Sequence, residues 1–124
     1  MKTIEQIGTA LGPEVLLACQ QLFDTEQQAL AAAVPVAASE QGYGPHERHR
    51  LDLYGRPASP APVILFVHGG GFRIGDMAAD GGPNAAVGRW AAQMGWLGAV
   101  MNYRLAPDHR WPAGHQGCTG EARR

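Results

Sequence analysis

The sequence has little cysteine, almost no lysine and no excess of charge of either sign. Its 124 residues contain two cysteines and a single lysine, and the formal net charge is −1 at pH 7. Cys19 and Cys118 lie far apart, which is typical neither of a disulfide framework nor of a metal-binding cluster. A near-neutral chain without a basic stripe gives no reason to expect a nucleic acid or an anionic membrane as a partner.

Long apolar runs are also absent. No stretch approaches the roughly 20 apolar residues that cross a bilayer. Glu5, Gln6 and Glu14 interrupt the region where a signal peptide would need its apolar core. We therefore expect a soluble, cytoplasmic protein. The length suits one domain, and the hydrophobic fraction of 45% is ordinary for a folded chain.

The most informative stretch is an apolar run, residues 62–67, followed by His68-Gly69-Gly70-Gly71. The run is rich in β-branched and aromatic residues, which predicts a strand buried on both faces of a parallel sheet. The three glycines let the backbone turn sharply and leave its N–H groups uncovered by side chains. This arrangement places hydrogen-bond donors at the carboxyl edge of a sheet, where open α/β folds bind their ligands.

Two phosphate-binding motifs can be tested against the same glycines. Gly70 and Gly75 have the spacing of a P-loop, but Asp76 stands where the phosphate-binding lysine is needed. Ile74 stands where the dinucleotide fingerprint needs its last glycine. We therefore expect no nucleotide and no other cofactor.

His46 and His49 are the only hint of a metal site. A closed zinc site needs four ligands, and no further ligands stand at a suitable spacing. We expect no metal, and we predict that both histidines are surface residues at the start of a strand.

Helices and strands are predicted on both sides of the glycines. A helix begins at Gly12-Pro13, and it either breaks at residues 24–26 or gives way to a second helix that ends near Ala33. Residues 49–54 alternate as a half-exposed strand, with the leucines on one face and Arg50, Asp52 and Tyr54 on the other.

A second strand follows the glycines after an intervening helix. Val87, Trp90, Ala91 and Met94 have the spacing of one apolar helix face, which predicts a helix that begins near Pro83 or Asn84 and ends at Gly95. Residues 96–101 are a second apolar run of strand length. Together the segments predict a βαβ unit in a parallel sheet. We expect a helical cap or packing segment over 1–40, an α/β domain over 41–113, and an unstructured tail over 114–124.

The second motif is Asn102-Tyr103-Arg104-Leu105-Ala106-Pro107. Together with His68-Gly69-Gly70-Gly71-Phe72, it resembles the α/β-hydrolase superfamily, in its carboxylesterase and hormone-sensitive-lipase-like branch. The resemblance covers about residues 47–113. It implies the N-terminal part of an α/β-hydrolase fold, with a partial, mostly parallel sheet.

The resemblance also implies roles for individual residues. The N–H groups of Gly70 and Gly71 would form an oxyanion hole for an ester substrate that reacts through a serine ester. The side chains of Phe72 and Trp111 would bind the substrate. The residues expected to support the loop are His68, Asp76, Tyr103 and Arg104.

The sequence does not contain the nucleophile that the family places in G-x-S-x-G. Its only serines, Ser39 and Ser59, have no flanking glycines and precede the glycine motif. We therefore expect an esterase by family whose isolated chain is catalytically inactive. Two alternatives stay open: a non-catalytic binding protein that reuses half of the fold, and a fragment of an arylformamidase-like amidase.

The resemblance also predicts an exposed sheet edge. It places the strand over residues 63–67 between the strand over 96–101 and the strand that leads to the nucleophile. Without that last strand, residues 63–67 form an open edge whose unpaired backbone groups favour association. We therefore expect the isolated chain to self-associate or to be only partly folded.

Overall fold

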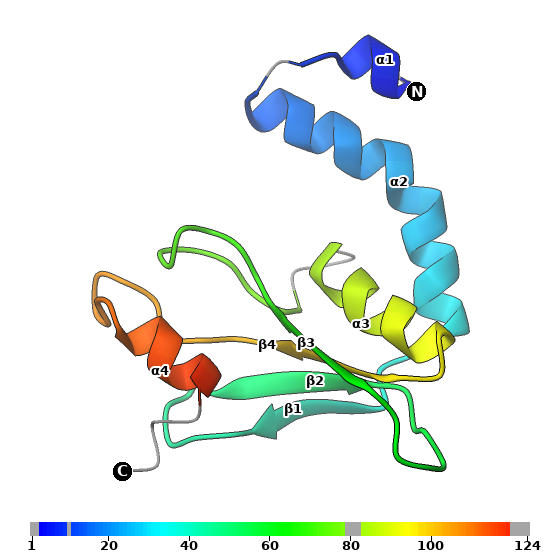
Figure 1. Ribbon diagram of the computed structural model, residues 1–124. Helices are drawn as coiled ribbons and strands as arrows, with labels where there is room; N and C mark the ends of the chain where they lie inside the picture. The colour runs from blue at the N-terminus through cyan, green and yellow to red at the C-terminus, as the bar shows by residue number, and fades with distance from the viewer. Residues whose placement is uncertain (1–2, 10, 79–82, 120–124) are drawn as a thin grey trace.

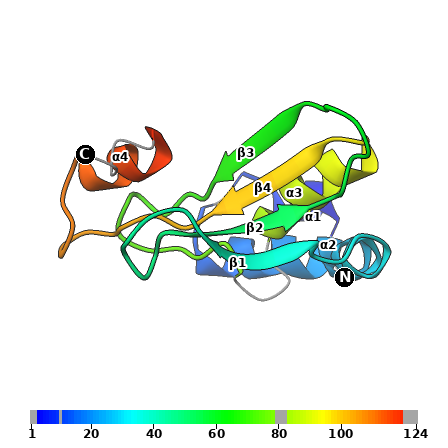
Figure 2. The same cartoon turned by 90° about the horizontal axis from the view of Figure 1, so that it is seen from below.

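The computed structural model describes residues 3–9, 11–78 and 83–119 (Figure 1). Its strands are β1 (Ala38–Gly42), β2 (Arg50–Tyr54), β3 (Val63–Val67) and β4 (Leu97–Met101). Its helices are α1 (Ile4–Ile7), α2 (Pro13–Ala33), α3 (Pro83–Gln93) and α4 (Ala113–Thr119). The strands form one sheet in the order β1-β2-β4-β3, visible side by side in Figure 2.

The predicted βαβ unit is confirmed. Strands β3 and β4 are parallel, with Leu65 opposite Ala99, and α3 lies between them in the chain. The sheet as a whole is mixed, however, because β2 is antiparallel both to β4 and to β1. The prediction of a mostly parallel sheet is therefore wrong for the described strands, of which only β3 and β4 pair in parallel. The connection from β1 to β2 spans only residues 43–49, and a parallel pair needs a crossover of about a dozen residues.

Helix α3 packs on the sheet through small residues. It begins at Pro83 and Gly95 follows it with a φ of 78°, as predicted. Gly88 lies so close to Gly98 of β4 that a Cβ on Gly98 would overlap the helix backbone. This close approach buries Ala91 but leaves Trp90 and Met94 about half exposed, so the predicted apolar face is only partly correct.

The buried core lies between α3 and the sheet. Its fully buried members are Tyr54, Met77 and Val100, and Phe66 packs against them. Tyr54 therefore lies on the buried face of β2, together with Asp52, whose Oδ1 accepts a 2.8 Å hydrogen bond from the N–H of Glu40. The alternation predicted for β2 is correct, but the leucine face is the less buried one because α3 covers the other side.

Strand β3 is not buried on both faces, and that prediction was wrong. Val63 and Leu65 keep 61% and 47% of their surface exposed, and no described helix crosses the face seen in Figure 2. Within the described residues β3 pairs only with β4 and ends the sheet. The predicted open edge is therefore present in this part of the chain.

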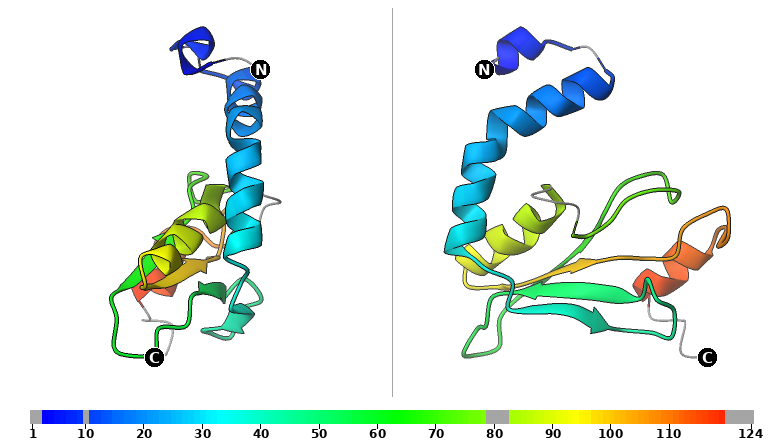
Figure 3. Two further views of the ribbon diagram at one scale, coloured as in Figure 1. Left: turned by 90° about the vertical axis from the view of Figure 1, so that its right-hand side faces the viewer. Right: turned by 180° about the vertical axis from the view of Figure 1, so that it is seen from behind.

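The N-terminal segment contains one continuous helix. Helix α2 runs from Pro13 to Ala33 with neither of the interruptions left open by the sequence, and none of its residues is buried. Figure 3 shows it projecting away from the sheet, with its C-terminal part beside α3. Strand β1, which starts at Ala38, was not predicted. The division of the chain into segments at residues 40 and 113 remains a prediction.

The predicted unstructured tail is wrong for its first six residues, because Ala113–Thr119 form α4. Gly114 and Gly117 are buried, and Gly114 packs against the rings of Phe72 and Tyr103. Tertiary contacts therefore stabilise a helix for which the local sequence gives no signal. Residues 120–124 of that tail lie outside the described residues.

No helix in the described part of the chain combines the length and apolar character needed to cross a membrane.

Candidate functional site

The segment 68–76, hereafter the glycine loop, leaves the carboxyl end of β3. His68 is buried, whereas residues 69–75 are exposed. Gly70, Gly71 and Phe72 have φ angles of 117°, 61° and 60°. Three successive positive φ values turn the chain sharply, and glycine adopts them without the steric cost of a Cβ. Phe72 bears that cost, of about 1–2 kcal/mol, and its surroundings hold it in place.

The first two carbonyl groups of the glycine loop are held by neighbouring side chains. The hydroxyl of Tyr103 donates to the carbonyl oxygen of His68 over 2.8 Å. The ring Nδ1 of His68 lies 2.7 Å from the carbonyl oxygen of Gly69. In a trans peptide the C=O and the following N–H point to opposite sides. The N–H groups of Gly69 and Gly70 are therefore directed away from these partners.

The third carbonyl is held within the loop itself. The carbonyl oxygen of Gly70 accepts from the N–H of Arg73 at 3.1 Å and of Ile74 at 3.2 Å. By the same peptide geometry, the N–H of Gly71 points out of that turn. Among the described residues, the N–H groups of Gly70 and Gly71 donate no hydrogen bond. Two backbone donors of exposed residues thus lack a hydrogen-bond partner within the described part of the chain.

His68 and Tyr103 form the base of the loop. Their rings stack with centroids 4.4 Å apart and an interplanar angle of 20°. Burial raises the pKa of Tyr103 above its ordinary value, so its hydroxyl remains a donor. Because a carbonyl oxygen only accepts, Nδ1 of His68 carries the proton. Its Nε2 is buried and has no partner among the described residues.

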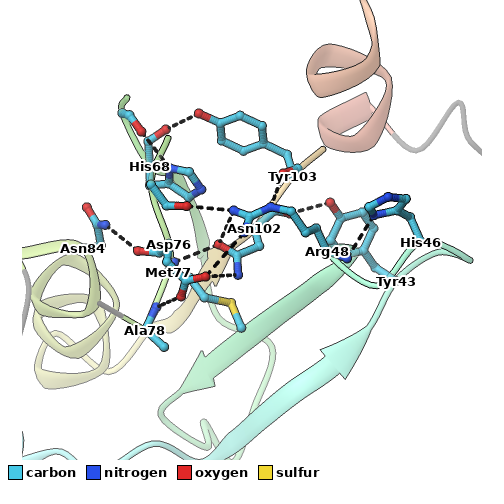
Figure 4. A network of polar contacts seen from close by, with 12 residues as sticks. Tyr43, His46, Arg48, His68, Asp76, Met77, Ala78, Asn84, Asn102 and Tyr103 are labelled. Carbon is cyan, nitrogen blue, oxygen red and sulfur yellow. Dashed lines mark hydrogen bonds and ion pairs between the residues drawn. The ribbon is translucent and has the colours of Figure 1, made fainter. Parts of the chain in front are cut away.

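The far end of the glycine loop is tied to the end of β4, as Figure 4 shows. The Asp76 carboxylate accepts from the side-chain amide of Asn102 at 3.0 Å and from the N–H of Ala78 at 2.8 Å. The Asn102 Oδ1 accepts from the N–H of Met77 at 2.8 Å. These contacts fit the predicted supporting role of Asp76.

Arg48 also joins this network, although no sequence pattern pointed to it. Its guanidinium lies 3.6 Å from the Asp76 carboxylate and donates to the carbonyl oxygens of Gly75 and Tyr103. The residue precedes β2 in the chain and meets the loop only through the fold. A long-range contact of this kind leaves no local pattern in the sequence.

Arg104 lies elsewhere than expected. Its Nη2 donates to the carbonyl oxygen of Ala113 and to Oε1 of Gln116, each at 3.3 Å. These contacts fasten α4 rather than the glycine loop. Its Nε is buried without a partner in the described part of the chain.

Phe72, which belongs to the glycine loop, and Trp111 are the residues expected to bind substrate, and their rings lie together. Their ring centroids are 6.0 Å apart, and 48% and 71% of their surfaces are exposed. The Phe72 ring also packs edge-on against the Tyr103 ring, with centroids 5.6 Å apart. The backbone carbonyl oxygen of Phe72 accepts a hydrogen bond from the N–H of Ala106 at 2.8 Å. The exposed glycine donors thus have an aromatic surface next to them.

The prediction that both histidines of the possible metal site are surface residues was wrong for His49. Only 1% of its surface is exposed, its ring stacks on Tyr43, and its Nδ1 accepts from the N–H of His46 at 3.3 Å. Burial and then the positive charge of Arg104 lower the pKa of His49. The residues that the structure describes contain no group of three or more His, Cys, Asp or Glu placed to hold a metal ion.

Neither of the two serines lies in the glycine loop or follows it in the chain. Ser39 lies on β1, at the opposite edge of the sheet from β3. Ser59 lies in the connection that enters β3, whereas the glycine loop leaves the other end of that strand.

Comparisons with known proteins match the same region. Residues 64–122 match a family model described as alpha/beta hydrolase fold. The chain is 44% identical over 73 residues to the esterase LipC of Mycobacterium tuberculosis, covering 56% of this chain and 17% of that protein. It is 41% identical over 62 residues to the tuliposide A-converting enzyme b1 of Tulipa gesneriana, covering 50% and 16%.

Solved structures show the same fold. An esterase B from Lactobacillus rhamnosis superposes with a TM-score of 0.61 and 24% identity, over 86% of this chain and 36% of that one. A hyperthermophilic esterase from Pyrobaculum calidifontis gives a TM-score of 0.53 and 25% identity, over 86% and 35%. The chain thus spans about a sixth of these curated relatives and about a third of these solved structures.

Proposed function

We propose that this chain, whose residues 64–122 match the alpha/beta hydrolase family model, is part of an α/β-hydrolase and supplies the oxyanion-binding part of a carboxylic ester hydrolase. One observation carries the proposal. The exposed N–H groups of Gly70 and Gly71 are free among the described residues, while the carbonyls of their own loop are held by internal partners. The names of the matched relatives, esterases among them, support an ester substrate.

The proposed chemistry is stabilisation of negative charge. Attack on an ester carbonyl places that charge on its oxygen, and donors already oriented toward it need no rearrangement during reaction. Each such donor contributes roughly 3 kcal/mol to the transition state. Phe72 and Trp111 would form an apolar wall for the acyl or alcohol group beside these donors.

The chain by itself is proposed to be inactive. The sequence has no G-x-S-x-G, so no serine is presented on the strained turn that the reaction requires. An oxyanion site without nucleophile and base retains at most about 10³–10⁴-fold catalysis over water. A cytoplasmic location remains our expectation from the sequence.

The test combines binding and turnover. We expect butyrate, titrated into ¹⁵N-labelled chain, to shift the amide resonances of Gly70 and Gly71 but not that of Gly55, a positive-φ glycine at the end of β2. We expect no hydrolysis of p-nitrophenyl butyrate. Absence of any shift at Gly70 and Gly71 would contradict the oxyanion role and leave a different binding function. Turnover that survives a serine-directed inhibitor would contradict the serine-esterase assignment.

We also propose that the isolated chain self-associates through β3, with a second copy of the chain as its partner. Val63, Leu65 and Val67 are 61%, 47% and 36% exposed, and β3 ends the described sheet. No charged residue lies between Val63 and Val67, so two such strands meet without charge repulsion. Exposed, uncharged edges of this kind favour pairing with another strand.

A further inference from the structure

We propose that Arg48 is a positioning residue that sets the orientation of the glycine-loop N–H groups. The proposal rests on the oxyanion role proposed for Gly70 and Gly71. Arg48 touches neither of them. It acts on the loop through the backbone of Gly75 and of Tyr103.

The guanidinium bridges the two segments that meet at the site. Its Nη2 donates to the carbonyl oxygen of Gly75 at 2.8 Å, at the end of the glycine loop. Its Nε donates to the carbonyl oxygen of Tyr103 at 2.9 Å, just after β4. Because the donors of a guanidinium are held in a rigid planar fork, these two bonds fix the separation of the two carbonyls.

The first route from Arg48 to the donors runs through Gly75. The backbone of Gly75, at a φ of 119°, lies directly against the ring of His68 and the carbonyl oxygen of Gly69. Nδ1 of the same ring holds that carbonyl oxygen at 2.7 Å. The carbonyl of Gly69 and the N–H of Gly70 belong to one peptide plane, so holding the first orients the second.

The second route runs through Tyr103. Arg48 holds its backbone carbonyl, and its side-chain hydroxyl holds the carbonyl oxygen of His68 at 2.8 Å. The Tyr103 ring also stacks on the His68 ring. Both routes therefore meet at His68, the residue from which the glycines start. Figure 4 shows Arg48, Asp76 and Asn102 within one network of polar contacts.

Hydrogen-bond geometry, rather than charge, gives Arg48 this role. Its ion pair with Asp76 is 3.6 Å long, and the Asp76 side chain is 46% exposed. Ion pairs this exposed contribute little, because water screens them. A lysine at position 48 would keep the charge near Asp76 but lose the planar fork. The substitution Arg48→Lys therefore separates positioning from charge.

Arg50 offers a matched control two residues along the chain. Its only recorded side-chain hydrogen bond in the described structure is a 3.4 Å contact to the carbonyl oxygen of His49. We expect Arg48→Lys to shift the free-chain amide resonances of residues 69–71 and to weaken butyrate binding by about tenfold or more. We expect Arg50→Lys to change neither, and the melting curves of both variants to match that of the wild type.

The outcomes are separable from those of the proposed function. If the wild-type chain fails to bind butyrate, the oxyanion role is overturned. The amide resonances of residues 69–71, measured without ligand, still test the positioning role of Arg48 in that case. Unchanged resonances of residues 69–71 in Arg48→Lys overturn the positioning role. Arg48→Gln serves as a second variant, because it keeps one amide donor without the fork. If Arg48→Lys and Arg48→Gln both unfold, Arg48 serves the general stability of the fold and the proposal is wrong.

Discussion

The hydroxyl of Tyr103 donates a 2.8 Å hydrogen bond to the carbonyl oxygen of His68, and the two rings stack with centroids 4.4 Å apart. Tyr103 follows the end of β4 and His68 follows the end of β3. This one residue pair therefore connects the end of β3, where the glycine loop begins, to the end of β4. Its bond turns the N–H of Gly69 to the side opposite Tyr103.

We expect Tyr103→Phe to keep the ring stacking and to lose only the hydrogen bond. The free energy of unfolding should fall by about 1 kcal/mol, measured by urea denaturation. Tyr43→Phe is the control, because the Tyr43 hydroxyl donates a similar bond, 2.6 Å long, to the carbonyl oxygen of Asn102. Only Tyr103→Phe should also shift the amide resonance of Gly69. Equal effects of both variants on that resonance would show that the Tyr103 bond does not orient the loop.

We expect Gly75→Ala to destabilise the protein strongly. A Cβ at this position would overlap the His68 ring and the carbonyl oxygen of Gly69, and the φ of 119° is unfavourable for alanine. Overpacking and backbone strain together should cost about 2–4 kcal/mol. Gly69→Ala is the control, since a Cβ there meets no atom within 4 Å and its φ is not in the left-handed range. Near-equal unfolding free energies for the two variants would contradict the close packing of Gly75 on His68.

We expect stability to decrease as the pH falls below about 6.5, the ordinary pKa of histidine. Burial and then the charge of Arg104 lower the pKa of His49 in the folded chain, and the neighbouring His46, His109 and Arg50 act in the same direction. The unfolded chain thus binds a proton at pH values where folded His49 does not. The resulting stability is complete above the unfolded pKa and is lost as the pH falls through the folded one.

The measurement is the urea midpoint at about pH 7.5 and at two lower values, for wild type and for His49→Gln. Glutamine keeps an acceptor for the N–H of His46 but does not titrate. The variant should lose part of the pH dependence seen in wild type. An identical pH dependence in both proteins would show that His49 does not carry it.

We expect Leu65→Lys to reduce self-association. A lysine in the middle of β3 places a charge on the exposed edge strand, which disfavours pairing with a second copy. Leu17→Lys is the control, because Leu17 is 55% exposed but lies on α2. Light scattering should report a smaller mean mass for Leu65→Lys only. A wild-type chain that is a clean monomer with a cooperative melt would count against association through β3.

Local patterns were sufficient to predict part of this protein. The apolar runs at residues 62–67 and 96–101 predicted β3 and β4, because runs of this composition and length are typical of strands and the helix between them brings them parallel. The glycines at 69–71 predicted a sharp turn with uncovered donors, and Gly70 and Gly71 have the positive φ angles that glycine adopts without steric cost. These are properties of neighbouring residues, so they can be seen in the sequence alone.

Tertiary structure decided the rest. Helix α4 forms because Gly114 packs against Phe72 and Tyr103, and its own sequence has no helical signal. His49 is buried, and Arg48 reaches Gly75 across 27 positions of the chain. In each case the partner is distant in sequence, and its contribution exists only after the chain has paid the entropy of bringing the two segments together. The sequence by itself determined which backbone donors this protein exposes, and the fold determined which side chains hold them in place.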